Sequence, residues 1–331
     1  MTVRVSVVIR CFNEEQHIGR LLAGIQEQDH RDREIIVVDS GSTDATLPIA
    51  RRYPVRVVSI PPQEFSFGRS LNLGCAEASG DVIVIASAHV YPVCQDWLSR
   101  LASPFADAAV GLVYGRQRGS GGSKYSEQQI FRKWFPDAAD ADQKHAFCNN
   151  ANAAIRRELW QLYPYDETLT GLEDLAWARQ VKAHGHRIVY ESAAEVVHVH
   201  DENWPRIYNR YRREAIAWRS IYPEEHFGAL DLCRLLASNI VSDWFHAFHD
   251  GVLGYHLFPI VSFRSAQFLG TWSGHTRRGA LSKELRQRFY YPHGLSRSGR
   301  GEDAGRDQRK VIDYSSIGAG DRVNDGAGRG Q

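Results

Sequence analysis

The chain has 331 residues, 43% hydrophobic and 11% aromatic, enough for one large α/β domain or two smaller ones. With 40 Lys and Arg against 39 Asp and Glu, the net charge is +1, which excludes the strongly basic composition of a general nucleic-acid binder. Its five cysteines lack C-x-x-C spacing, which predicts reduced thiols in a cytoplasmic protein and excludes a disulfide framework or a zinc ribbon.

The first part of the chain alternates predicted strands and helices. Apolar runs predict strands over 3–9, 34–38, 55–60 and 82–86. Helical spacing predicts helices over 13–26 and 67–78, and a short helix that ends at Arg52. This alternation is typical of a mostly parallel sheet with both faces covered by helices. Neither a G-x-G-x-x-G fingerprint nor a P-loop is present, so neither a dinucleotide fold nor a P-loop fold is supported.

The middle of the chain has a less regular pattern. Residues 116–124 are rich in Gly and Ser and basic, which predicts a loop, and residues 125–136 are aromatic and polar. Helices are predicted over 157–162 and 172–184, and strands over 187–190 and 195–199.

The last third changes from amphipathic helices to polar sequence. Residues 204–275 show helical spacing, and residues 296–331 contain too few apolar side chains to offset ordering entropy, which predicts a disordered tail. The predicted organisation is therefore a catalytic domain over 1–203, a helical extension over 204–295 and the tail over 296–331. The catalytic domain divides into a donor half, 1–115, and an acceptor half, 116–203.

Polar residues follow the predicted strands where a parallel sheet binds its ligands. The first strand ends in Arg10 and runs into Asn13 and Glu14, the second ends at Asp39, and the fourth is followed by Ser87-Ala88-His89. Ligands in such sheets lie beyond the carboxyl ends of the strands. Asp39 taken alone is equally typical of a turn aspartate, but two acidic strand ends at this spacing favour a ligand site.

The chain resembles the family 2 glycosyltransferases, which have the GT-A nucleotide-sugar fold. The resemblance covers roughly 3–200, and its motifs are 6–15 (SVVIRCFNEE), 37–44 (VVDSGSTD), 68–74 (GRSLNLG) and 171–174 (GLED). It implies that Arg10, Asn13, Glu14 and Asp39 contact the donor, with the last three on its base and ribose. It further implies that Arg69, Asn72 and Ser87 lie near the ribose, diphosphate and sugar.

The same resemblance places a metal site at the end of the fourth strand. The family usually has Asp-x-Asp there, with the last Asp on Mn²⁺ or Mg²⁺, whereas this chain has Ser87-Ala88-His89. His89 aligns with the metal ligand, and imidazole suits Mn²⁺ better than Mg²⁺. His198 and His200 point to one side of a strand, and His200 is the expected second ligand. A hydrogen-bonded polar histidine pair is the alternative.

Glu173 and Asp174 open a predicted helix. An acidic pair at that position is also a simple capping pattern. The resemblance implies that Asp174 is the catalytic base of an inverting transfer and that Glu173 positions the acceptor.

Two segments are left with open interpretations. Residues 204–218 interleave arginine and aromatic residues, typical of a packed amphipathic helix, of a contact to diphosphate or an acidic acceptor, or of the inner membrane surface. Arg116 and Arg118 belong either to a lid over the donor or to a solvated loop.

The sequence thus predicts a cytoplasmic, metal-dependent inverting glycosyltransferase, with contact at the inner membrane face left open. It has no secretion signal and no apolar run near the ~18 residues of a bilayer span. Its donor would be a nucleotide-diphosphate sugar, UDP-linked by default, and its acceptor a saccharide or glycolipid of surface-polysaccharide synthesis. The alternatives are a non-catalytic nucleotide-sugar-binding or scaffold protein, favoured by Ser87, and a nucleotidylyltransferase, disfavoured because no basic Gly-rich loop follows the first strand.

Overall fold

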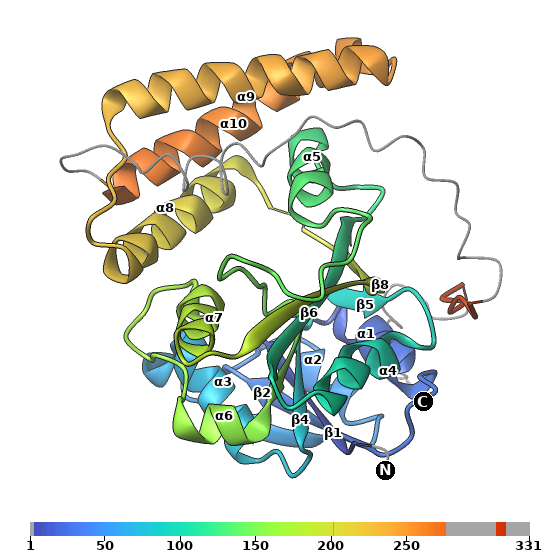
Figure 1. Ribbon diagram of the computed structural model, residues 1–331. Coiled ribbons are helices and arrows are strands. Elements are labelled where there is room, and N and C mark those ends of the chain that lie inside the picture. Colours follow the sequence, from blue (N-terminus) through green and yellow to red (C-terminus); the bar gives the residue numbers. More distant parts are fainter. Residues whose placement is uncertain (1–2, 201, 276–308, 316–331) are drawn as a thin grey trace, which may run out of the picture.

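The computed structural model describes residues 3–200, 202–275 and 309–315. Its centre is an eight-stranded mixed sheet in the order β3-β2-β1-β4-β7-β6-β8-β5, covered on both faces by helices (Figure 1). The strands are β1 (Val5–Cys11), β2 (Arg33–Asp39), β3 (Arg56–Ser59), β4 (Val82–Ser87), β5 (Val90–Pro92), β6 (Val110–Gly119), β7 (Asn152–Arg156) and β8 (Arg187–His198). The first four pair in parallel, as the alternation predicts, whereas β7 and β5 are antiparallel to their neighbours.

Helices cover both faces because the central strands bury side chains in both directions. Along β1, Val7 and Ile9 pack into one core with α1 and α4, while Val8 packs into the other with α3 and α7. A strand that is buried on both sides needs apolar residues at successive positions, which explains the continuous runs in the sequence. The helices of the sheet domain are α1 (Ile18–Gln26), α2 (Thr46–Ala50), α3 (Phe67–Ala76), α4 (Trp97–Ala102), α5 (Tyr125–Trp134), α6 (Arg157–Leu162) and α7 (Glu173–Ala183), with short 3₁₀ turns at Pro62–Glu64 and Ser103–Ala106.

Residues 116–203 form more regular secondary structure than their sequence pattern predicts. Residues 187–198 form the single strand β8, and β6 continues to Gly119, into the segment expected to be a loop. Arg116 and Arg118 therefore lie on a strand, where their guanidinium groups pair with Asp137 and Glu195 respectively. Tertiary pairing accounts for the difference, because β6 is held between β7 and β8.

Three long helices, α8 (Trp204–Ile221), α9 (Ala229–His249) and α10 (Leu253–His275), form the C-terminal extension on one side of the sheet domain (Figure 1). The amphipathic pattern of residues 204–275 is thus confirmed as helix. Helices α8 and α10 cross closely at two glycines: a Cβ on Gly270 would lie 2.4 Å from the Tyr208 carbonyl oxygen, and one on Gly274 would lie 2.5 Å from the Arg212 carbonyl oxygen. Glycine is therefore required at both positions. None of the described helices is long and apolar enough to cross a membrane.

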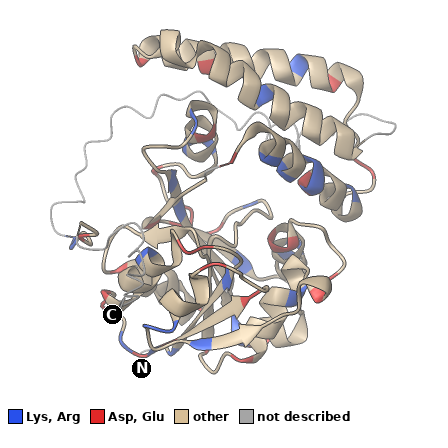
Figure 2. Cartoon of the chain, turned by 180° about the vertical axis from the view of Figure 1, so that it is seen from behind, with Lys and Arg blue, Asp and Glu red and all other residues tan. Residues whose placement is uncertain are grey.

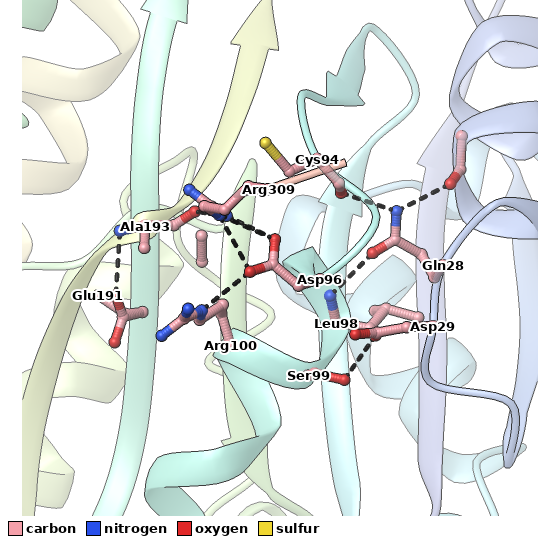
Figure 3. A network of polar contacts seen from close by, with 12 residues as sticks. Gln28, Asp29, Cys94, Asp96, Leu98, Ser99, Arg100, Glu191, Ala193 and Arg309 are labelled. Atoms are coloured by element: carbon pink, nitrogen blue, oxygen red, sulfur yellow. Dashed lines mark hydrogen bonds and ion pairs between the residues drawn. The ribbon is translucent and has the colours of Figure 1, made fainter. Parts of the chain in front are cut away.

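Part of the C-terminal tail is folded against the sheet domain, contrary to the prediction of disorder over 296–331. Val311 bridges Cys94, Ile312 is buried, and Arg309 pairs with Asp96 at 2.6 Å while donating to the Ala193 carbonyl (Figure 3). The segment 309–315 contains Val311, Ile312 and Tyr314, enough apolar surface for local docking even though the composition around it is polar. The rest of the predicted tail lies outside the described residues.

Candidate active site

The carboxyl ends of β1, β2 and β4 form one edge of the sheet, as the sequence predicts. Arg10 on β1 is level with Ser87 on β4, and Cys11 is level with Asp39 on β2. The Asp39 carboxylate is buried and accepts hydrogen bonds from the backbone N–H groups of Gly41 and Ser42. Asp39 thus shapes the turn after β2, where Gly41 has a φ of +90° that favours glycine.

The loop after β1 is joined to the loop after β2. Asn13, with a φ of 54°, donates its backbone N–H to the Ser42 hydroxyl, and its side chain accepts from the Thr43 N–H at 2.8 Å. Left-handed backbone at a non-glycine residue is uncommon and marks a locally constrained conformation. The constraint leaves the neighbouring ring of Phe12 54% exposed at this edge of the sheet.

Three histidines converge beside the same edge. His89 follows β4, His198 ends β8 and His200 follows it, and one ligand nitrogen of each lies within 4.8 Å of the others. The ring centroids are 5.0 Å apart for His89 and His198, and 4.0 Å apart for His198 and His200. The strand pairing explains this meeting, because β5, which starts at Val90, aligns Val90 with His198.

A side-chain oxygen holds the Nδ1 atom of each histidine. The partners are Glu14 for His89 at 2.8 Å, Gln117 for His198 at 2.7 Å and Glu127 for His200 at 2.7 Å. Carboxylate oxygens only accept hydrogen bonds, so Glu14 and Glu127 each receive an Nδ1 proton and direct Nε2 of His89 and His200 away from them, the arrangement by which proteins orient metal-binding histidines. The Nε2 atom of His198 is buried and has no hydrogen-bond partner among the described residues.

The imidazoles of His198 and His200 are held in the neutral form. Burial lowers the pKa of His198 and of His200 well below 6.5, and the positive charge of Arg210 adds to the shift of both. Neutral imidazole is the form that binds metal. The buried, unpartnered Nε2 and the all-nitrogen donor set therefore fit a transition-metal ion better than Mg²⁺.

The acidic pair Glu173-Asp174 opens α7 directly after Leu172, whose φ is 56°. The Glu173 carboxylate is buried and forms a 3.0 Å ion pair with Nη1 of Arg10, which also lies over the Phe67 ring. Arg10 thus joins the end of β1 to the acidic pair.

Asp174 lies in an environment that favours its protonated form. Burial and the negative charge of Glu173 raise the pKa of Asp174 from 3.8 to about 7, against the opposing hydrogen bonds that its carboxylate accepts from the N–H groups of Asn150 and Leu175. A carboxylate with a pKa near neutrality is suited to general acid–base work.

A cavity of about 130 Å³ lies between the sheet domain and the C-terminal helices. His198 and His200 line one side, Leu172 lies beside the acidic pair, and α8 and α10 contribute Trp218 and Gln267. Its mostly apolar wall with a few convergent polar groups is typical of a small-molecule site.

Arg69 and Asn72, which the sequence predicts to lie near the donor, both contact neighbouring residues of the sheet domain. The Asn72 side chain donates to the Tyr165 carbonyl and Glu167, and accepts from the Trp160 indole and the Tyr165 N–H. Arg69 pairs with Glu64 at 2.7 Å and with Glu167 at 3.5 Å. The hydrogen bonds of Asn72 therefore tie α3 to α6 and to the loop after it, and a donor contact at Arg69 and Asn72 stays a prediction.

Sequence reasoning missed two residues of the site, Glu127 and Asn150. Glu127 is buried and contacts both His200 and Arg210, the latter at 3.0 Å. Asn150 gives its backbone N–H to Asp174, while both polar atoms of its buried amide lack a partner among the described residues. No motif marks Glu127 or Asn150. The i, i+2 spacing of His198 and His200 did indicate both histidines, and His200 was the one expected to bind the metal.

Comparisons with known proteins agree with this architecture. Residues 6–162 match the sequence model described as "Glycosyl transferase family 2". The O-antigen chain rhamnosyltransferase RfbN of Salmonella typhimurium is 25% identical over 225 residues, which are 63% of this chain and 70% of that protein. WbaN of Salmonella anatum, also named an O-antigen chain rhamnosyltransferase, is 27% identical over 56% of this chain and 62% of its own length.

Solved structures with the same fold include two glycosyltransferases with Mn²⁺ and a nucleotide sugar. The mannosyltransferase PcManGT from Pyrobaculum calidifontis, in complex with GDP-Man and Mn²⁺, has a TM-score of 0.58 at 19% identity, over 83% of this chain and 87% of that one. Glucosyl-3-phosphoglycerate synthase from Mycobacterium tuberculosis, with Mn²⁺ and UDP-glucose, has a TM-score of 0.51 at 22% identity, over 66% and 79%. These likenesses establish the GT-A fold that the sequence predicts.

Proposed function

We propose that this chain, whose residues 6–162 match the model of glycosyltransferase family 2, moves a sugar from a nucleotide-diphosphate donor to a saccharide or glycolipid acceptor with inversion. The observation that carries the proposal is the 3.0 Å ion pair between Arg10 and Glu173. Through this pair, residues 163 positions apart bring the Glu-Asp pair to the ligand-binding edge of the sheet.

Asp174 is the proposed catalytic base. Its carboxylate would take the proton of the acceptor hydroxyl while that oxygen attacks the anomeric carbon, and the bond from that carbon to the diphosphate would break on the opposite face. A pKa near 7 makes Asp174 a stronger base than an ordinary aspartate and leaves about half of it ionised in neutral solution. Glu173, fixed by Arg10, would position the acceptor.

His89, His198 and His200 are the proposed metal ligands. A bound divalent cation would supply neutralisation of the negative charge that develops on the leaving diphosphate. The support is the convergence of the three rings and the hydrogen bonds that hold their Nδ1 atoms. Three imidazole nitrogen donors favour Mn²⁺ or another transition metal over Mg²⁺.

The loops after β1 and β2 are the proposed donor site, with UDP as the default nucleotide. Asn13 and Asp39 border it, and Ser87 lies beside Arg10 towards the diphosphate. Glu14 acts there by orienting His89, a more specific role than the base or ribose contact expected from the sequence. Binding of the donor would then depend on the metal ion that the histidines hold.

The proposed acceptor site is the cavity between the sheet domain and the helices α8 and α10. Two similar proteins are named as O-antigen chain rhamnosyltransferases, which supports a growing surface polysaccharide as acceptor class. The matched regions cover 70% and 62% of those two proteins, so their sugar and acceptor are proposals for this chain.

A thermal-shift panel tests the proposed donor and metal together. UDP, dTDP and GDP, and their sugar derivatives including a nucleotide-linked rhamnose, would be added with and without Mn²⁺. Because a ligand that binds the native state raises Tm, we expect one nucleotide diphosphate to raise Tm only when Mn²⁺ is present. No stabilisation by any nucleotide would contradict the proposed donor class, and stabilisation independent of metal would contradict the proposed metal site.

A further inference from the structure

The docked segment 309–315 lies beside β5, and the proposed reaction gives it no role. Figure 2 shows it as a short piece with blue and red bands at the edge of the sheet domain. The Ile312 N–H donates to the Val93 carbonyl at 3.0 Å, and the Gln95 N–H donates to the Lys310 carbonyl at 2.9 Å. The segment thus pairs with the chain just beyond β5, the outermost strand of the sheet.

Tyr314 joins β5 to α1. Its hydroxyl donates to the Pro92 carbonyl of β5 at 2.7 Å, and its ring meets the Tyr91 ring edge-on with the centroids 5.0 Å apart. On the α1 side lies Gly24, where a Cβ would overlap the Tyr314 hydroxyl oxygen and lie 3.0 Å from Cδ of Pro92. Only glycine leaves room for the tyrosine at this point of α1.

Strand β5 in turn holds the backbone of His89. It has only three residues, begins directly after His89, and pairs with β8 alone among the described strands. In this ladder Val90 aligns with His198, and the His89 carbonyl accepts from the Val199 N–H at 3.0 Å. A strand this short forms few hydrogen bonds of its own, so its position depends on what packs against it.

The contact between Glu14 and His89 spans the same two elements that Tyr314 joins. The Glu14 carbonyl accepts from the N–H of Ile18, the first residue of α1, at 2.9 Å, and His89 precedes β5. Oε1 of Glu14 lies 2.8 Å from Nδ1 of His89. A displacement of β5 against α1 would change this contact and, with it, the direction of the imidazole ring.

We propose that the docked segment 309–315 positions His89 for a metal ion, with Tyr314 as the positioning residue that holds β5 against α1. The inference rests on the metal site of the proposed function. Loss of the contacts that orient a metal ligand typically lowers metal affinity by roughly 10–100-fold. Tyr314 acts through the backbone of β5, so its loss should fall at the lower end of this range.

A Mn²⁺ titration of the full chain, followed by the electron paramagnetic resonance signal of free Mn²⁺, tests the proposal without donor or acceptor. We expect Tyr314→Ala to raise the Kd for Mn²⁺ by about tenfold, and Tyr314→Phe, which keeps the ring and loses the hydrogen bond, to raise it less. Val311→Ala, in the same segment at a side chain 60% exposed, is the matched control and should bind Mn²⁺ as the wild type does. Ile221→Ala, in the core of the C-terminal helices, should lower Tm without changing this Kd.

Gly24→Ala tests the same route from the side of α1. Alanine favours a helix more than glycine does, so α1 itself should not be weakened, but the new Cβ would displace the Tyr314 hydroxyl. We therefore expect Gly24→Ala to raise the Kd for Mn²⁺. The double variant with Tyr314→Ala should bind no more weakly than Tyr314→Ala alone, because both substitutions act through one contact.

An unchanged Kd in Tyr314→Ala, or losses that add in the double variant, would overturn the proposal. Circular dichroism without Mn²⁺ identifies a variant that fails to fold. If Tyr314→Ala fails, Tyr314→Phe and Gly24→Ala decide, and an unchanged Kd in both overturns the proposal. A wild type that binds no Mn²⁺ would instead overturn the proposed metal site and this inference with it, so the two failures are distinguishable.

Discussion

The acidic pair Glu173-Asp174 and the histidine cluster both contain buried polar side chains, but the hydrogen bonds around those side chains differ. Each histidine has one nitrogen held by a neighbouring oxygen, and its other nitrogen is left for a ligand. Asp174 instead accepts backbone hydrogen bonds at both oxygens and lies beside Glu173, which shifts its protonation. In the proposed function, the histidine cluster binds a cation and Asp174 accepts a proton. Substitutions in the two regions should therefore change different measurable quantities.

Asp174→Asn should have the largest effect. An amide cannot take the acceptor proton, so turnover should fall by about 10²–10⁴-fold, the usual contribution of a general base. The donor Kd should change little, because the proposed donor site lies at the β1 and β2 loops. Asp142→Asn, at an exposed aspartate paired with Lys144, is the control and should turn over normally. Normal turnover by Asp174→Asn would remove this residue from the chemistry.

His198→Ala should remove the metal response. Loss of one of three ligands should weaken Mn²⁺ binding by at least about a hundredfold, which is measured as loss of the Mn²⁺-dependent Tm shift. His184→Ala, at an exposed histidine bonded to the Gln180 carbonyl, should keep the full response. An unchanged Mn²⁺ response in His198→Ala would reduce the cluster to a structural histidine set.

Glu14→Ala should weaken the same response by a smaller amount. Glu14 orients His89, and losses of such orienting partners typically reduce metal affinity by roughly 10–100-fold. Glu14→Gln should recover part of this loss, because its Oε1 can still accept from Nδ1. Equal losses for Ala and Gln would mean that Glu14 acts by its charge and not by orienting the ring.

The pH dependence of turnover should report the acidic pair. Because the folded pKa of Asp174 is raised to about 7, the fraction of ionised base falls below that pH. With saturating donor and metal, kcat should fall about tenfold per pH unit well below 7 and level off above it. A flat profile between pH 5 and 8 would contradict an unusually high pKa at the base, since an ordinary aspartate is fully ionised across roughly that range.

Arg309→Gln should have the smallest effect. Arg309 forms an ion pair with Asp96 and donates a hydrogen bond to the Ala193 carbonyl of β8, the strand that ends at His198 (Figure 3). We expect a loss of about 1 kcal/mol in the free energy of unfolding, because the pair is only partly buried. Arg100→Gln, a more exposed partner of Asp96, should cost less. If the two variants lost the same free energy of unfolding, the pair between Asp96 and the docked segment 309–315 would add no more than the exposed pair with Arg100.

The sequence predicts the donor half of the fold well, because its parallel strands are buried on both faces and read as continuous apolar runs. It predicts His89, His200, Glu173 and Asp174 in positions that the structure brings to one side of the sheet. The other features depend on tertiary pairing, which the local sequence does not show. Strand β6 runs through a Gly-rich segment, and Glu127 contacts His200 from a helix that has no recognisable motif. The hydrogen bonds by which Asn72 ties α3 to the loop after α6 were likewise not predicted from its motif.

The most direct test of the account compares Asp174→Asn and His198→Ala side by side, with donor Kd and kcat measured for both with and without Mn²⁺. The account predicts that Asp174→Asn loses kcat and keeps its Mn²⁺-dependent donor affinity, and that His198→Ala loses that affinity. The same pattern of losses in both variants would contradict the separation of proton transfer at Asp174 from metal and donor binding at the histidines.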